Sequence, residues 1–77
     1  MISFDSNKNG KHIIFCKNTG QIILEKYYLN NLLHGKYVYY WSNGRIRFSG
    51  TFSKNKRIGT WTNYDKYGQV ILEEDYS

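Results

Sequence analysis

Residues 35–52, GKYVYYWSNGRIRFSGTF, decide the fold because they belong to a repeat. Displaced by 24 residues, the segment 35–44 (GKYVYYWSNG) falls on 59–68 (GTWTNYDKYG) and on 11–20 (KHIIFCKNTG). Glycines recur at Gly20, Gly44 and Gly68, and aromatic residues recur at Phe4, Tyr28, Phe52 and Tyr76. A fixed period of this length predicts a repeat array, and we expect the register to hold without insertion from Phe4 to Tyr76.

Each repeat is predicted to contain a strand, a tight turn, a second strand and a second turn. Tyr, Ile, Phe and Val dominate between the glycines, proline is absent, and the apolar spacing is two rather than three or four. The sequence therefore predicts an all-β fold: a single twisted antiparallel meander of successive β-hairpin repeats, with about seven strands. Residues 1–77 form one domain, with a half unit at 1–10 and units at 11–34, 35–58 and 59–77.

The glycine-ended loops are KNTG, WSNG and DKYG. Asn43-Gly44 alone would suggest a two-residue type I′ turn, which needs a positive φ at both residues. Thr19 and Tyr67 hold the place of Asn43 in the other repeats, and such side chains resist a positive φ. We therefore expect a longer loop around a type I turn, in which only the glycine is left-handed.

The length of these loops sets which side chains share a face. A four-residue loop places Tyr40 opposite Arg45, and then Tyr39 opposes Ile46 and Tyr37 opposes Phe48. The predicted core face carries Ile13, Phe15, Ile22, Leu24, Tyr28, Tyr37, Tyr39, Ile46, Phe48, Phe52, Trp61, Val70, Leu72 and Tyr76. The other face carries Lys36, Val38, Tyr40, Arg45, Arg47, Tyr64, Ile23 and Ile71. Matching of large apolar residues across each hairpin, including Trp61 with Leu72, favours this register.

Composition gives no support for a metal, a cofactor or a disulfide. Cys16 is the only cysteine, and with His12 and His34 it supplies too few ligands for a structural zinc site. The N-terminal segment MISFDSNKNG lacks the features of a signal peptide, and no apolar run is long enough to span a membrane. We therefore expect a cytoplasmic protein without a transmembrane segment.

No catalytic constellation emerges, so the protein is not expected to be an enzyme. The two histidines are interpreted as surface residues, and the Cys16 thiol as partly buried and inert. Glu73, Glu74 and Asp75 form a run that is typical of a solvated edge strand. A more specific alternative is that this acidic strand contacts the basic middle repeat of another copy of the chain.

Five residues are candidates for partner binding, and no catalytic or metal-ligating residue is proposed. The chain carries a net charge of +5, with much of the basic charge in the middle repeat. Tyr and Arg are enriched in interface hot spots, although Tyr–Arg neighbours also strengthen a sheet. The candidates are Lys36, Tyr40, Arg45, Arg47 and Tyr64.

The pattern GxWxxYxxxG at residues 59–68, followed by alternating apolar residues and an aromatic residue, resembles the MORN repeat (membrane occupation and recognition nexus), in its bacterial class of about 24 residues. The first repeat departs from it, because Lys11 replaces the opening glycine and Ile13 the aromatic residue. The resemblance implies an antiparallel sheet of hairpins. Bacterial relatives are described as antitoxin- or immunity-like partners of polymorphic toxins, and eukaryotic ones are linked to phospholipid binding and dimeric scaffolds.

The leading functional hypothesis is a non-enzymatic protein-binding module, an antitoxin, an immunity protein or a phage or mobile-element inhibitor that blocks a partner protein. Recognition of single-stranded nucleic acid or anionic lipid is an alternative, because aromatics beside Lys and Arg can stack bases and hold phosphates. A homo-oligomeric scaffold is a third. An uncovered apolar face and open edges also predict a homodimer, through edge-strand pairing or through an aromatic surface near Trp61 and Phe52.

Overall fold

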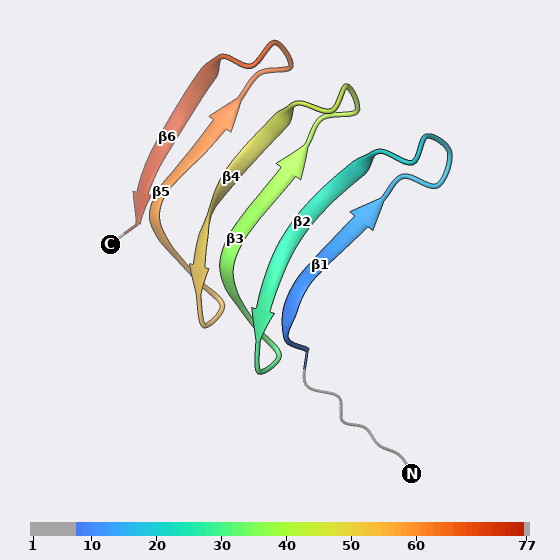
Figure 1. Ribbon diagram of the computed structural model, residues 1–77. Coiled ribbons are helices and arrows are strands. Elements are labelled where there is room, and N and C mark those ends of the chain that lie inside the picture. The colour runs from blue at the N-terminus through green and yellow to red at the C-terminus, as the bar shows by residue number, and fades with distance from the viewer. Residues whose placement is uncertain (1–7, 77) are drawn as a thin grey trace.

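The computed structural model describes residues 8–76, which form one open antiparallel sheet of six strands (Figure 1). The strands are β1 (Gly10–Phe15), β2 (Ile22–Leu29), β3 (Leu32–Tyr40), β4 (Ile46–Ser53), β5 (Lys56–Tyr64) and β6 (Val70–Tyr76). Each strand pairs with the next along the chain, which confirms the predicted all-β meander of hairpins. The seventh strand that the repeat predicts falls on residues 1–7, outside the described residues.

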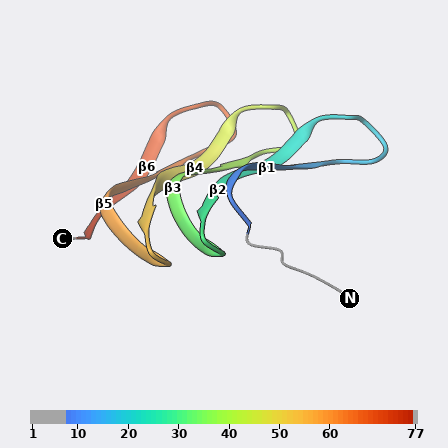
Figure 2. The same cartoon turned by 60° about the horizontal axis from the view of Figure 1, so that its bottom comes forward.

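The strands bend along their length (Figure 2), while the sheet as a whole stays a thin layer with extents of 48 × 38 × 11 Å. All five strand pairs contain a register shift, and the last of them lies between Asn63 and Tyr64. Bulges of this kind increase local twist and bend a strand. Their recurrence in every pair explains why all the strands bend.

The two kinds of turn differ in backbone conformation. In the three longer turns only the glycine has a positive φ, 76° at Gly20, 89° at Gly44 and 95° at Gly68, which confirms the expectation for these loops. The turns at residues 30–31 and 54–55 are two-residue turns in which both residues have a positive φ. Asparagine tolerates this conformation better than most residues, and it holds three of these four positions.

The predicted register is wrong in the second and third hairpins. Tyr39 pairs with Phe48 and Tyr40 pairs with Ile46, whereas the four-residue loop would have placed Tyr39 opposite Ile46. The turn closes between Trp41 and Arg45, and a bulge then moves the pairing by one residue. The prediction assumed uninterrupted pairing on both sides of the loop, and a bulge breaks that assumption.

The same shift recurs in the third hairpin, where Trp61 pairs with Glu74 and not with Leu72. An unbroken two-residue alternation along each strand therefore assigns some residues to the wrong partner. Leu72 instead pairs with Asn63.

The first hairpin contains one residue more than the other two. Gly10, and not Lys11, corresponds to Gly35 and Gly59, because Gly10 pairs with Tyr28 as Gly35 pairs with Phe52. All three glycines have a positive φ, at 87°, 109° and 68°. The expectation of a repeat without insertion is therefore wrong for β1.

The additional residue lies in the first long turn. The Gly20 amide donates to the carbonyl of Cys16, four residues earlier, whereas the Gly44 amide donates to that of Trp41, three residues earlier. Since Gly20 stays in phase with the other loop glycines, the sequence alone conceals the displacement of β1.

This displacement changes the place of His12. Two residues after Gly10, it occupies the position that Tyr37 holds in the second repeat, and its ring meets Tyr28 edge-on at a centroid distance of 4.9 Å. It is half-buried, so its interpretation as a surface histidine is corrected. Ile13 pairs with Glu25 and moves to the other face.

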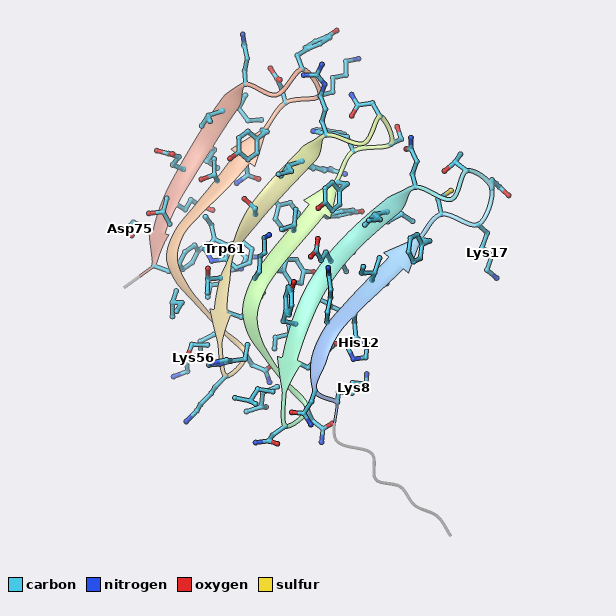
Figure 3. All side chains as sticks on the ribbon, in the orientation of Figure 1. Lys8, His12, Lys17, Lys56, Trp61 and Asp75 are labelled. Atoms are coloured by element: carbon cyan, nitrogen blue, oxygen red, sulfur yellow. The ribbon has the colours of Figure 1, made fainter. Side chains whose placement is uncertain are left out.

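Both faces contribute to the core: Val38, which the sequence assigned to the other face, is 3% exposed, and a cluster of rings covers the opposite side, which we call the aromatic face. Its members are Tyr37, Tyr39, Phe48, Phe52, Trp61 and Tyr76. Trp61 is 2% exposed and lies between β4 and β5 (Figure 3). Its ring centroid lies 5.1 Å from that of Phe52, and its Nε1 donates to the Thr51 carbonyl at 3.2 Å. Trp61 therefore has almost no surface left for a second copy of the chain.

Candidate binding site

The second and third long turns lie beside each other at one end of the sheet (Figure 1) and are joined by three side-chain hydrogen bonds. Trp41 Nε1 donates to the Tyr64 carbonyl at 3.2 Å, Asn43 Nδ2 to the Lys66 carbonyl at 2.8 Å, and Arg45 Nη1 to the Tyr67 carbonyl at 2.6 Å. Each donor reaches the next repeat, so these bonds fix the spacing of the two turns. Arg45 therefore helps to hold the second turn against the third through its hydrogen bond to Tyr67.

The first long turn has no such connection. At the places of Trp41, Asn43 and Arg45 the first repeat has Cys16, Thr19 and Gln21, since the Cys16 amide donates to the Gln21 carbonyl as the Trp41 amide donates to that of Arg45. Within the part of the chain that the structure describes, no hydrogen bond joins residues 16–21 to residues 41–45. The additional residue and the changed side chains together leave these two turns apart.

A hollow of about 370 Å³ lies between the first and second long turns, and we call it the turn hollow. It is lined by Cys16, Thr19, Gln21, Ile22, Ile23, Tyr39, Tyr40, Trp41, Ser42 and Arg47. Its volume lies in the range of ligand pockets, and its lining is mostly apolar with a few polar groups. Two of the five predicted site residues, Tyr40 and Arg47, meet here.

Arg47 is the bulged residue of β4 and is exposed. Its guanidinium carbon lies 4.5 Å from the ring centroid of Trp41 and 5.4 Å from that of Tyr39. The sequence suggested that Arg45 and Arg47 share a side of one strand, but the bulge separates their environments. Arg47 presents a cation held on two aromatic rings at the rim of the turn hollow.

Tyr40 connects the turn hollow to a buried carboxylate. Its hydroxyl donates to Glu25 Oε1 at 3.2 Å, Tyr27 donates to Oε2 at 3.2 Å, and Lys11 Nζ lies 3.4 Å from Oε2. Burial raises the pKa of Glu25, but the Tyr40 hydrogen bond and the Lys11 charge outweigh it, so the pKa lies below its ordinary value. Glu25 is 9% exposed, and these contacts keep it ionised.

The same contact acts on Tyr40 in the opposite direction. Burial, then the hydrogen bond and the charge of Glu25, raise the pKa of the Tyr40 phenol. Tyr40 therefore stays a neutral hydrogen-bond donor at physiological pH. Its hydroxyl holds Glu25, and its ring supplies apolar surface to the turn hollow.

Cys16 places a thiol on the wall of the turn hollow that the first long turn forms. A hydrogen bond with the Thr19 side chain, followed by backbone hydrogen bonds of Thr19 and Asn18, lowers the pKa of this thiol, and partial burial only partly opposes them. The expectation of an inert thiol did not foresee this polar turn. A thiol with a lowered pKa is a better nucleophile at neutral pH than an ordinary one.

The other predicted residues lie apart from the turn hollow. Lys36 is exposed and pairs with Thr51 in the β3–β4 pair. Tyr64 belongs to the third hairpin, where its carbonyl accepts the Trp41 hydrogen bond. Thus the five predicted residues do not form a single surface.

Sequence reasoning missed most of the lining of the turn hollow. Tyr39 and Ile22 were assigned to the core, Trp41 was treated as part of a loop, and Thr19 was discussed only for its φ. A signal was present in the sequence, because the turn residues of the first repeat depart from those of the other two. Their meaning depended on the contacts between neighbouring turns, which no single repeat reveals.

Two further findings concern the described residues 8–76. Their His, Cys, Asp and Glu side chains include no group of three that is placed to hold a metal ion. They also contain no helix with the length and apolar character needed to cross a bilayer. No family model, curated protein or solved structure matches the chain.

Proposed function

We propose that this chain is a cytoplasmic, non-enzymatic protein-binding module that blocks a partner protein, as an antitoxin, an immunity protein or a phage or mobile-element inhibitor does. The observation that carries the proposal is the turn hollow, where Tyr39, Tyr40, Trp41 and Arg47 surround a space that no side chain of residues 8–76 fills. Tyr, Trp and Arg are the residue types that contribute most to protein interfaces.

The chemistry of the turn hollow favours a protein side chain as its occupant. Aromatic rings offer apolar area, and the guanidinium of Arg47 is suited to a carboxylate on the partner. Its fixed position on two rings reduces the entropy that binding would cost. An apolar anchor residue next to an acidic one matches this combination.

The same lining gives little support for an enzyme. Thr19, Ser42 and Gln21 are neutral polar residues, and neither histidine of the chain lies among the lining residues. Cys16 is the single nucleophile with a lowered pKa there, and the lining offers it no general base. A binding role needs no general base and can use all of these residues as contacts.

The antitoxin or immunity role rests on the resemblance to bacterial MORN repeats, to which a meander of hairpins is well suited. Anion recognition remains the alternative, but it has less support. Arg45 donates to the Tyr67 carbonyl, and Lys36 lies in the β3–β4 pair away from the bulge at Arg47. The basic residues therefore do not form the continuous track that a nucleic-acid backbone follows.

Affinity capture from native cells tests this proposal. The tagged wild-type chain is compared with Arg47→Glu, which reverses the charge at the turn hollow, and with Lys66→Glu, an exposed third-turn control with the same charge change. We expect one stoichiometric protein partner with the wild type and with Lys66→Glu, and its loss with Arg47→Glu. Circular dichroism confirms that each variant is folded.

Two results would overturn the proposal. One is the absence of any stoichiometric protein partner. The other is equal capture by Arg47→Glu and the wild type, since that would remove the turn hollow from the interface. Binding of a single-stranded oligonucleotide or of anionic vesicles that falls steeply with salt would instead favour the alternative.

A further inference from the structure

We propose that the two edges of the sheet recognise each other, so that β6 of one copy pairs with β1 of the next and the meander continues from chain to chain. This contact lies on the outer strands and does not involve the turn hollow, and it replaces the seventh strand that the sequence suggested, because both would use the outer edge of β1. It therefore stands or fails independently of the proposed function.

The first support is the phase of the repeat. In the described sheet, β2 and β4 are each followed by a two-residue turn. Each then pairs with the odd-numbered strand after that turn, β2 with β3 and β4 with β5. β6 is the third even-numbered strand and has no odd-numbered partner on that side among residues 8–76. β1 is an odd-numbered strand, and Gly10 has the positive φ that Gly35 and Gly59 have within β3 and β5.

The repeat also fixes the register of the new pair. Within the chain, Lys26 pairs with Tyr37. Glu74 corresponds to Lys26 and His12 corresponds to Tyr37, so Glu74 would oppose His12 of the next copy. By the same rule, the Phe52–Arg57 pair predicts that Tyr76 opposes Lys8 of the next copy.

The second support is charge complementarity. Figure 3 shows Lys8 and His12 at one edge of the sheet and Asp75 at the opposite edge. β6 carries Glu73, Glu74 and Asp75, three of the six acidic residues of the chain. β1 and the residue pair before it carry Lys8, Lys11 and His12 with no acid among them, and of these Lys11 already lies 3.4 Å from Glu25 Oε2 of its own chain. Opposite charges on adjacent strands stabilise a pair, and like charges destabilise it.

The third support is the apolar surface at both edges. Val70, Ile71 and Leu72 on β6 are 53%, 64% and 51% exposed, and Ile14 and Phe15 on β1 are 44% and 54% exposed. Exposed edge strands of this kind readily pair with another chain. By the rule used for the register, the Leu24–Tyr39 pair predicts that Leu72 opposes Ile14 of the next copy, so apolar residues meet there, and the Glu25–Val38 pair places Glu73 opposite Ile13.

These features favour a head-to-tail contact over the twofold homodimer that the sequence suggested. A twofold β6–β6 pair would bring two acidic strands together, and a β1–β1 pair would join two basic ones. A head-to-tail contact leaves one free edge at each end, so it produces a ring or a filament.

Two single charge reversals test the contact. Glu74→Lys makes β6 more basic, Lys8→Glu makes the β1 edge more acidic, and Lys66→Glu in the third turn serves as a control with the charge change of Lys8→Glu. Light scattering should show a wild-type mass that rises with concentration above the 9.2 kDa of one chain. We expect each edge variant to associate roughly tenfold more weakly, the control to behave as wild type, and an equimolar mixture of the two edge variants to recover.

Cysteine cross-linking tests the register independently. A chain with Cys16→Ser, Glu74→Cys and His12→Cys should give, on mild oxidation, a ladder of covalent dimers, trimers and larger species. The proposal is wrong if the wild type has a mass of 9.2 kDa at all concentrations, or if association stops at a dimer that neither edge variant weakens. A cross-linked ladder limited to dimers would also contradict it. Failure here leaves capture through the turn hollow unaffected, because Arg47 and Lys66 lie outside both edge strands.

Discussion

The indole ring of Trp61 lies directly against Gly50 on the neighbouring strand. A Cβ atom added to Gly50 would stand 2.1 Å from Cδ2 of Trp61, closer than real contacts allow. Glycine at this position is therefore required by the ring and not by the backbone, because Gly50 does not have a positive φ. This contact allows Trp61 to be almost fully buried in a sheet of a single layer.

We therefore expect Gly50→Ala to lower the free energy of unfolding by about 3 kcal/mol, the upper range for overpacked cores. Urea unfolding followed by tryptophan fluorescence measures it. Ser49→Ala, one position away on the opposite face, is the control and should change stability by less than about 1 kcal/mol. If Gly50→Ala were as stable as the wild type, Trp61 would not pack as described.

The place of β1 in the repeat gives a second prediction. Gly10 has a φ of 87° and no atom within 4 Å of an added Cβ, so Gly10→Ala isolates the cost of the backbone conformation. We expect a loss of about 1 kcal/mol in chemical unfolding. If Lys11 held the framing position instead, Gly10→Ala would be neutral and Lys11→Gly would be stabilising.

The general fold could be predicted from the sequence because glycines and aromatics at a fixed spacing restrict it strongly. The prediction that only the loop glycines are left-handed succeeded for the same reason, since Thr19 and Tyr67 exclude a type I′ turn. The strand pairing could not be predicted as well. Bulges change the partner of Tyr39, and the additional residue in the first turn displaces β1 without disturbing Gly20.

The candidate site depended on contacts that cross from one repeat to the next. Arg45 and Arg47 are close in sequence, yet one donates to a carbonyl of the third turn and the other lies on two rings. Similarly, Tyr40 was recognised as a possible binding residue, but its bond to Glu25 requires the β2–β3 pairing. Composition identified the residue types, and only the pairing of strands assigned their contacts.

The buried Glu25 carboxylate makes stability depend on pH. Its folded-state pKa is depressed below its ordinary value of 4.5, so its contribution is fully present above that value and is lost as the pH falls through the folded pKa. We expect Glu25→Gln to lower the free energy of unfolding by about 2 kcal/mol at neutral pH. The reason is that Tyr27, Tyr40 and Lys11 then face a neutral amide in place of a carboxylate. Denaturation at several pH values should show a smaller acid-induced loss of stability in Glu25→Gln than in the wild type. Equal losses would contradict this role of Glu25.

The Cys16 thiol provides a chemical probe of the turn hollow. Because hydrogen bonds with Thr19 and Asn18 lower its pKa, the midpoint of the alkylation rate against pH should be lower in the folded chain than in urea. Mass spectrometry after timed treatment with iodoacetamide measures this rate. A midpoint at or above that of the unfolded chain would show that these hydrogen bonds do not control the thiol.

A bulky adduct on Cys16 should also occupy the turn hollow that it lines. We expect the maleimide-treated chain to lose partner capture, whereas the Cys16→Ser chain after the same treatment keeps it. Retained capture by the modified chain would place the partner elsewhere on the sheet.

Photo-cross-linking at matched turn positions tests the central claim most directly. Ser42 lines the turn hollow, and Lys66 holds the corresponding position one repeat later, in the third turn. A photoreactive residue at each position is activated in native cells. We expect one protein to cross-link at Ser42 but not at Lys66, and excess wild-type chain to compete with it while the Arg47→Glu chain does not. Identical cross-links at both positions, or none at Ser42, would contradict binding through the turn hollow.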